Sequence, residues 1–185
     1  MDRIIKAFTF KTDVYAEVEN DLSFTNTAWL IVAVVSFLNQ LGARASSNFG
    51  NWLLGAVIGT AFAVLGFAVA TYVINLVGRV VFKADVNFGE LVRTLGLAYV
   101  WQVVGLLGVL GAFSLTLACI ISPLIFLGWI LTVIAWFIAV KEALDLDWVP
   151  TIVTVILGGI TLIVVNLLAG VVLTAIGLTG LALFG

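Results

Sequence analysis

The sequence predicts an all-α polytopic membrane protein, built as a bundle of five transmembrane helices behind an amphipathic N-terminal segment. Two observations lead to this fold class. Hydrophobic residues make up 63% of the 185 residues and charged residues only 10%, whereas soluble domains carry about 25% charged residues. The apolar residues also fall into long runs separated by short polar breaks. A soluble fold of this length has no means of burying so much apolar surface, so lipid surrounds most of the chain.

Residues 1–21 are predicted to form a separate cytoplasmic segment at the membrane interface. Several acidic residues precede the first apolar run, which starts near Ala28, so this segment is not a secretory signal. Apolar residues recur at helical spacing in two sets, Ile4, Ile5 and Phe8, then Val14, Val18 and Leu22. We expect one or two short helices lying in the membrane interface. The alternative is a plain soluble lead-in, because both apolar faces are narrow.

Residues 22–185 form the predicted transmembrane domain, and its first span covers residues 22–43. Ser23 or Asn26 is suited to capping the start of this helix. Asn39, Gln40 and Arg44 mark its far end, where a short polar link begins.

The second span is predicted over residues 52–77. At 1.5 Å per residue it is about 39 Å long, more than the hydrocarbon core of about 30 Å, so it must tilt or extend past the core. Gly55 and Gly59 form a GxxxG motif, and Ala63 continues the small-residue stripe. Such a stripe allows close helix approach, either to another helix of this chain or to a second copy.

The third span, residues 89–110, follows the longest polar break inside the apolar sequence. Asp85 and Asn87 suit a turn, and Glu90 places an acid in the first turn of the new helix. The fourth span is predicted over residues 122–144, with Ser122 as N-cap and Pro123 at the first helical position. A kinked helix starting near Phe113 is the alternative. The apolar residues 111–121 are otherwise a link.

The fifth span is predicted over residues 151–176, followed by a glycine-rich tail. Sorting the basic residues by these loops gives an unequal division. One side holds Arg3, Lys6, Lys11, Arg79, Lys83, Arg93 and Lys141, and the other holds Arg44. Positive charge favours the cytoplasmic side, so the N-terminus is predicted in the cytoplasm and the C-terminus outside.

Two segments of this sequence resemble the YIP domain, the family of Ypt/Rab-interacting multi-pass membrane proteins and their prokaryotic relatives. The first segment, before and into the third span, reads FGELVRTLGLAY, and the second, at the end of the fourth span, reads WFIAVKEALDLD. The matching residues are Phe88, Gly89, Glu90, Leu91, Arg93, Gly96, Tyr99, Trp136, Ala139, Lys141, Ala143 and Leu144. The similarity extends over about residues 10–175.

What this resemblance implies is the five-span fold and a cytoplasmic N-terminus. The Asp-Leu-Tyr-Gly-Pro motif of the eukaryotic members is absent, and their Gly-Tyr motif is present only as Ala98-Tyr99. The chain therefore looks like a prokaryotic-type member in the cytoplasmic (inner) membrane, and Rab binding is not carried over to it.

Composition argues against most catalytic chemistry. The chain has no histidine and one cysteine, Cys119, which removes the usual ligands of zinc and haem and the usual catalytic bases. We therefore expect no enzyme, no cofactor and no metal site. The net charge of −2 is too small to indicate nucleic acid.

Five charged residues around the third span's start form a candidate surface for a partner protein or a lipid head group. They are Arg79, Lys83, Asp85, Glu90 and Arg93. Arg93 is the strongest candidate, because its guanidinium can pair with Glu90 three residues earlier or with an anionic lipid. The alternative is that these charges only anchor and orient the chain at the membrane edge.

Four polar residues interrupt the spans: Asn75, Tyr99, Gln102 and Asn166. In lipid such side chains hydrogen-bond to neighbouring helices, which is their expected role here. The predicted function is a non-enzymatic membrane scaffold or accessory subunit. Its partners are the lipid bilayer and other membrane proteins or further copies of this chain. The alternative is a small transporter or channel with a polar path lined by Asn75, Gln102 and Asn166.

Overall fold

The computed structural model describes residues 2–46 and 48–177, and these residues form helices and no strands. The elements are α1 (Asp2–Phe8), α2 (Asp13–Asn20), α3 (Phe24–Ala43), α4 (Phe49–Val80), α5 (Phe88–Ala98), η1 (Tyr99–Leu107), α6 (Gly108–Gly111), α7 (Leu115–Leu144) and α8 (Trp148–Ala175). Five helical stretches are long and apolar enough to cross a membrane. The predicted all-α polytopic bundle is confirmed. The expected glycine-rich tail lies almost entirely outside the described residues.

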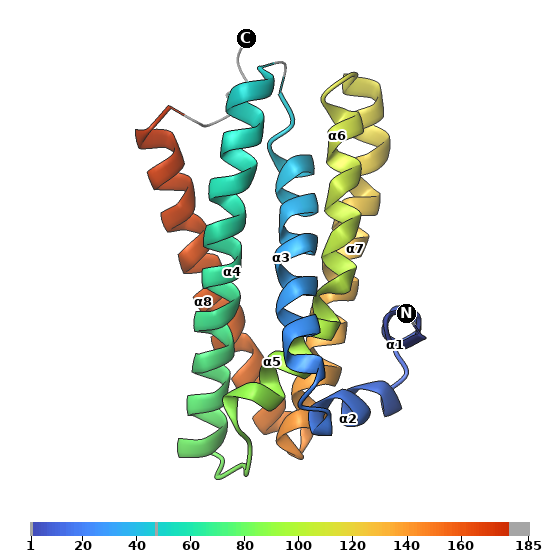
Figure 1. Ribbon diagram of the computed structural model, residues 1–185, viewed down its shortest axis with the longest axis vertical. Coiled ribbons are helices and arrows are strands. Elements are labelled where there is room, and N and C mark those ends of the chain that lie inside the picture. The colour runs from blue at the N-terminus through green and yellow to red at the C-terminus, as the bar shows by residue number, and fades with distance from the viewer. Residues whose placement is uncertain (1, 47, 178–185) are drawn as a thin grey trace.

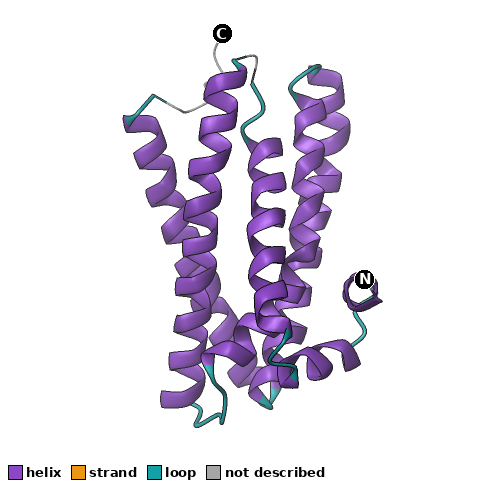
Figure 2. Cartoon of the chain, in the orientation of Figure 1, coloured by secondary structure: helices purple, strands orange, loops and turns teal. Residues whose placement is uncertain are grey.

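The five spans run alternately in opposite directions (Figure 1). The third span is the continuous run of α5, η1 and α6, from Phe88 to Gly111. Helix α2 lies across one end of the bundle, the lower end in Figure 1, which we call the α2 end. The loops between spans are short (Figure 2). Helix α4 packs chiefly against α8 and α3, and α3 packs against η1.

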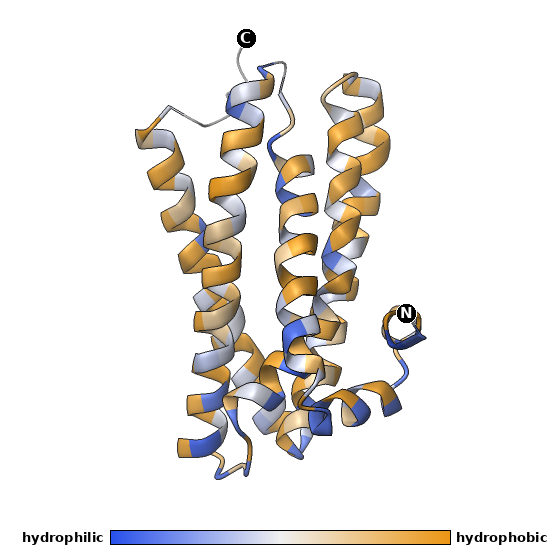
Figure 3. Ribbon diagram, viewed as in Figure 1, coloured by the Kyte–Doolittle hydropathy of each residue, from blue (hydrophilic) through white to orange (hydrophobic). Residues whose placement is uncertain are grey.

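Hydrophilic residues are concentrated in α1, in α2 and toward the α2 end of the spans, while the bodies of the spans are mostly hydrophobic (Figure 3). Arg79, Lys83 and Lys141 lie at or beyond the helix ends there, and Arg44 follows the opposite end of α3. The structure thus keeps the unequal division of basic residues between the two ends. Which end faces the cytoplasm stays a prediction.

The aromatic side chain of Phe67 lies at the centre of the core. It is fully buried, and its ring makes edge-to-face contacts with Trp29, Tyr99 and Trp136 at centroid distances of 5.6, 5.5 and 6.4 Å. These partners come from α3, η1 and α7, so one α4 residue contacts three other spans. Edge-to-face pairs add attraction beyond the burial of apolar area.

The third span differs from the uniform helix that its hydropathy predicts, because residues 99–107 form a 3₁₀ helix. Runs of this kind longer than three or four residues are uncommon. Helix α3 packs against this stretch, and the Asn39 Nδ2 donates to the Gln102 carbonyl oxygen at 2.9 Å. A Cβ added to Gly42 would lie only 2.8 Å from the carbonyl carbon of Gly105, so the two backbones meet where only glycine fits.

The predicted start of the fourth span at Ser122 is wrong. Helix α7 begins at Leu115, and Pro123 lies inside it. The chain turns earlier, at Ser114, which is extended (φ −160°, ψ 132°). Ser122 caps nothing there, and its Oγ donates to the Ala118 carbonyl at 2.7 Å. The alternative helix start near Phe113 is therefore close to the observed one, and most of the apolar link is the first turns of α7.

The remaining boundaries shift by a few residues. Helix α4 is extended to Phe49–Val80 because Asn48 caps it, accepting from the Asn51 amide at 3.1 Å. Helix α3 begins at Phe24 without a side-chain cap from Ser23. Helix α8 begins three residues before the predicted Thr151.

The N-terminal segment forms two helices, and they pack against the bundle. Val14, Tyr15 and Val18 of α2 are fully buried, and α2 contacts α5 and α7. Leu22, expected on the same apolar face, is instead 77% exposed, because α2 ends at Asn20. Placement of these helices in the membrane interface stays a prediction.

Candidate functional site

The candidate site at the α2 end begins with the start of α5. Asn87 and Glu90 form a capping box: the Asn87 side chain accepts from the Glu90 amide at 3.0 Å, and the Glu90 carboxylate accepts from the Asn87 amide at 2.8 Å. This box satisfies two backbone donors that the helix end leaves free. It fixes the direction of α5 and places Arg93, one turn further on, against α2.

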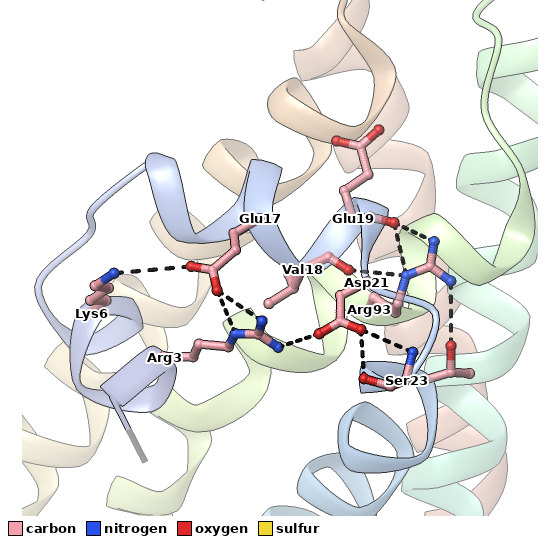
Figure 4. Close-up of polar contacts among 9 residues, drawn as sticks. Arg3, Lys6, Glu17, Val18, Glu19, Asp21, Ser23 and Arg93 are labelled. Carbon is pink, nitrogen blue, oxygen red and sulfur yellow. Dashed lines mark hydrogen bonds and ion pairs between the residues drawn. The ribbon is translucent and has the colours of Figure 1, made fainter.

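Arg93 is buried, with 3% of its surface exposed. Its Nε donates to the carbonyl oxygens of Val18 and Glu19 at 3.0 and 2.9 Å, and its Nη2 also donates to Glu19. Its Nη1 donates to the Thr25 Oγ1 at 3.3 Å. The guanidinium thus joins α5 to the last turn of α2 and to the first turn of α3 (Figure 4).

The carbonyls that Arg93 contacts are chemically suited to a cation. The last four carbonyl groups of a helix have no partner within the helix, and the helix dipole places partial negative charge there. Arg93 therefore caps α2 from another helix and is stabilised by carbonyl dipoles. The expected pairing of Arg93 with Glu90 is wrong, because the Glu90 carboxylate is occupied by Asn87.

A second set of contacts ties α1 to α2. The Arg3 guanidinium forms ion pairs with Glu17 at 2.8 Å and with Asp21 at 2.7 Å. Hydrogen bonds from Ser23 and from Arg3 hold the pKa of the Asp21 carboxyl below its usual value. The same carboxylates raise the pKa of Arg3. These pairs are half exposed and contribute less than the buried contacts of Arg93.

Around Glu19, several carboxylates and one cation, Arg93, influence the charge of its side chain. Burial raises the pKa of Glu19, and the neighbouring carboxylates of Asp145, Glu90 and Glu142 raise it further, while Arg93 opposes them. The surroundings of Glu19 are thus mainly acidic, and the buried guanidinium of Arg93 is the cation that opposes them.

An aromatic contact holds α1. The Trp101 ring of η1 lies edge-on to Phe8 at 4.9 Å and stacked with Phe10 at 5.3 Å. The sequence analysis missed this contact and the Arg3 ion pairs. The available signal in the sequence was Trp101 together with two phenylalanines, Phe8 at the end of α1 and Phe10 just after it.

The predicted five-residue surface divides into two parts. Glu90 and Arg93 have structural partners inside the chain. Arg79, Lys83 and Asp85 are exposed, and no described carboxylate lies within ion-pair distance of Arg79 or Lys83. Only this second part is free to contact another molecule.

The small-residue stripe of α4 faces other helices of this chain. Gly55, Gly59 and Ala63 are buried, and a Cβ on Gly59 would meet the Gln40 Oε1 of α3 at 2.5 Å. Further along, Gly66 faces Val165 of α8 at 3.2 Å. Of the two alternatives, the stripe therefore serves internal packing.

No hydrogen bond joins any two of the four intramembrane polar residues, and each has a partner elsewhere in the described chain. Asn75 is buried and donates to the Val86 carbonyl at 3.4 Å. Tyr99 is buried beside Ser36, whose Oγ donates to the Tyr99 hydroxyl at 3.4 Å. Gln102 accepts from Asn39 through its backbone. Asn166 is exposed on α8, and its Nδ2 donates to the Leu162 carbonyl at 2.8 Å.

Several buried polar atoms have no hydrogen-bond partner among the described residues: the Tyr15 hydroxyl, the Thr71 Oγ1 and the Nε1 atoms of Trp101 and Trp136. Burial raises the pKa of Tyr15 to about 12. The four residues with these unpaired atoms come from four different elements, α2, α4, η1 and α7, and define no common site. The described residues also contain no group of three or more Asp, Glu or Cys side chains suited to a metal ion.

No family model, curated protein or solved structure matches this chain. The class of protein is therefore defined by its fold, an integral membrane protein with five apolar helices. The resemblance to the YIP domain stays a prediction based on the residues quoted above.

Proposed function

We propose that this chain is a non-enzymatic membrane scaffold or accessory subunit that packs against other membrane proteins. The observation that carries the proposal is the position of Asn166. Its side chain is exposed on α8, in a span with a mean hydropathy of 2.6. Its Nδ2 donates to the Leu162 carbonyl, which leaves the side-chain oxygen and the second N–H of the carboxamide without a partner among the described residues. In hydrocarbon such groups are unfavourable unless a neighbour bonds to them, and neighbouring helices are the usual source of that bond.

The surroundings of Asn166 are suited to close approach by another helix. Gly159 and Gly170 lie seven residues before it and four after it, so the three share one face of α8. A Cβ added at either glycine would have nothing within 4 Å. This face is therefore open within the chain, and a partner helix would bring its backbone near and bond to the Asn166 carboxamide.

The proposal includes a cytoplasmic N-terminus and a location in a prokaryotic inner membrane. The basic residues at the α2 end support a cytoplasmic N-terminus, because positive charge is retained on that side. A prokaryotic inner membrane and a YIP-like role rest on the sequence resemblance. A transporter or channel has less support, since Asn166 faces outward and Asn75 bonds to the Val86 loop.

The test is site-directed photocrosslinking in native membranes. A photoreactive residue at position 166 should give one discrete protein adduct. The same photoreactive residue at Val153, which is exposed near the start of α8, serves as the matched control. Asn166→Leu should reduce recovery of the companion after mild detergent extraction. A lone monomer with no adduct at position 166 in intact membranes would overturn the proposal.

A further inference from the structure

A shallow apolar groove lies between α4 and the start of α5. It is lined by Ala68, Val69 and Tyr72 of α4 and by Phe88 of α5, and its volume is about 420 Å³. That volume falls within the range of about 300–1,000 Å³ found for small-molecule sites. Val69 and Tyr72 are also exposed, so the groove opens toward the lipid.

The groove lies at the depth of the upper part of a lipid chain. Helix α4 has 32 residues, so it is about 48 Å long and extends past a hydrocarbon core of about 30 Å. Tyr72 lies eight residues before the helix end, near the expected hydrocarbon boundary, where tyrosine is favoured. Ala68 lies one turn deeper.

Basic residues stand at the shallow end of the groove. Arg79 follows Tyr72 by seven residues, nearly two full turns, so it lies on the same face of α4 about 10 Å nearer the α2 end. Lys83 follows in the loop with a positive φ of 61°. Both are exposed, and neither has a carboxylate within ion-pair distance among the described residues.

We infer that this groove binds an anionic phospholipid, with one acyl chain along Ala68, Tyr72 and Phe88 and its phosphate at Arg79 and Lys83. The apolar lining suits a hydrocarbon chain. An arginine at the lipid head-group depth donates two hydrogen bonds to phosphate, and Lys83 adds a second positive charge. A net negative head group is favoured over a zwitterionic one, because the latter brings its own cation to the two basic side chains.

A second copy of this chain fits the groove less well. The groove is too shallow to accommodate a helix of a second chain. A symmetric dimer formed through this face would also place Arg79 of one chain near Arg79 of the other. The inference is also independent of the proposed partner face, because that face belongs to α8 and the groove to α4 and α5.

The test uses the purified chain in nanodiscs of phosphatidylcholine with phosphatidylglycerol, followed by native mass spectrometry of the released protein. We expect one retained phosphatidylglycerol and little retained phosphatidylcholine. The double variant Arg79→Gln, Lys83→Asn should lower retention about tenfold, as expected for a lost charge-assisted hydrogen bond. Asparagine at position 83 tolerates the positive φ. Lys11→Gln, at an exposed lysine between α1 and α2, is the control and should retain the lipid.

The groove itself is tested by filling it. Ala68→Phe should lower retention, whereas Val153→Phe, on the outer face of α8, should not. A phosphatidylglycerol carrying a photoreactive acyl chain should label the peptide containing residues 68–72. Equal retention of both lipids, labelling spread evenly over α7 and α8, or a dimer without bound lipid would overturn the inference.

Discussion

The guanidinium of Arg93 donates from both Nε and Nη2 to the single carbonyl oxygen of Glu19. These residues are 74 positions apart, so this contact fastens the N-terminal segment to the third span. Arg93, which the sequence made the strongest candidate for contact with a partner or a lipid, instead donates its hydrogen bonds to groups within this chain. Of the three basic residues of the predicted surface, Arg79 and Lys83 are the two that stay exposed and have no ion pair among the described residues.

Replacing Arg93 should release α2 from the bundle. Arg93→Leu leaves the Val18 and Glu19 carbonyls without their donors, and charge-assisted hydrogen bonds contribute about 1.5–3 kcal/mol each. We expect amide hydrogen exchange in residues 13–20 to accelerate about 100-fold, corresponding to about 3 kcal/mol. Exchange in α8 should change little. Arg79→Gln is the matched control, and unchanged exchange in α2 of the Arg93 variant would refute this role.

Glu19→Gln should stabilise the protein at neutral pH. The pKa of Glu19 is raised in the folded state, first by burial and then by Asp145, so folding favours the protonated form. The wild type therefore loses stability as pH rises from the ordinary glutamate value of about 4.3 through the raised one. Glutamine stays neutral and keeps the backbone carbonyl that Arg93 needs.

Thermal melting of both proteins between pH 5 and 8 checks this expectation. The difference in melting temperature should be largest at pH 8 and should shrink toward pH 5. Glu17→Gln is the control, because it removes an ion pair with Arg3 and should not raise the melting temperature. The pKa of Asp21 is lowered, so its contribution is lost only at more acid pH. A Glu19 variant less stable than wild type at pH 8 would contradict the prediction.

Gly42→Ala should be strongly destabilising. Its Cβ would lie 2.8 Å from the Gly105 carbonyl carbon and 3.0 Å from the Leu106 Cα, both backbone atoms that cannot rotate away. Overpacking of this kind costs about 1–3 kcal/mol. Gly59→Ala should cost less, because the ends of the flexible Gln40 and Arg44 side chains can move.

Melting temperatures in one detergent rank these variants. Gly170→Ala is the control, since nothing lies within 4 Å of its added Cβ and alanine favours the helix by about 1 kcal/mol. Gly59→Leu, a larger side chain, should lower the melting temperature more than Gly59→Ala. Equal melting temperatures for Gly42→Ala and Gly170→Ala would mean that α3 and η1 do not meet closely.

The orientation is tested with single cysteines in a Cys119→Ser background. A thiol reagent that does not cross membranes should label Ser46→Cys from outside in intact cells. Asp13→Cys and Asp85→Cys should be labelled only after lysis, because positive charge holds the α2 end in the cytoplasm. Labelling of position 85 from outside would reverse the proposed orientation.

The sequence by itself determined the fold class and the approximate position of all five spans. This follows because crossing a hydrocarbon core requires about 20 apolar residues, and that requirement is local. It also indicated the start of α5, since Asn87 suits a turn and Glu90 places an acid in the first turn of the helix that follows. The start of the fourth span was predicted wrongly at Ser122, because Ser122-Pro123 is typical of a helix start but here lies inside α7, and the chain turns at Ser114.

Only the tertiary structure decided what the polar and small residues contact. The partners of Arg93 are backbone carbonyls on α2, which carry no sequence signal and are distant in the chain. Asn39 and Gly42 of α3 contact the backbone of η1 at residues 63 positions further along the chain. Hydropathy is a property of each residue, whereas a hydrogen bond between spans depends on which helix faces meet, and the packing of the whole bundle determines those faces.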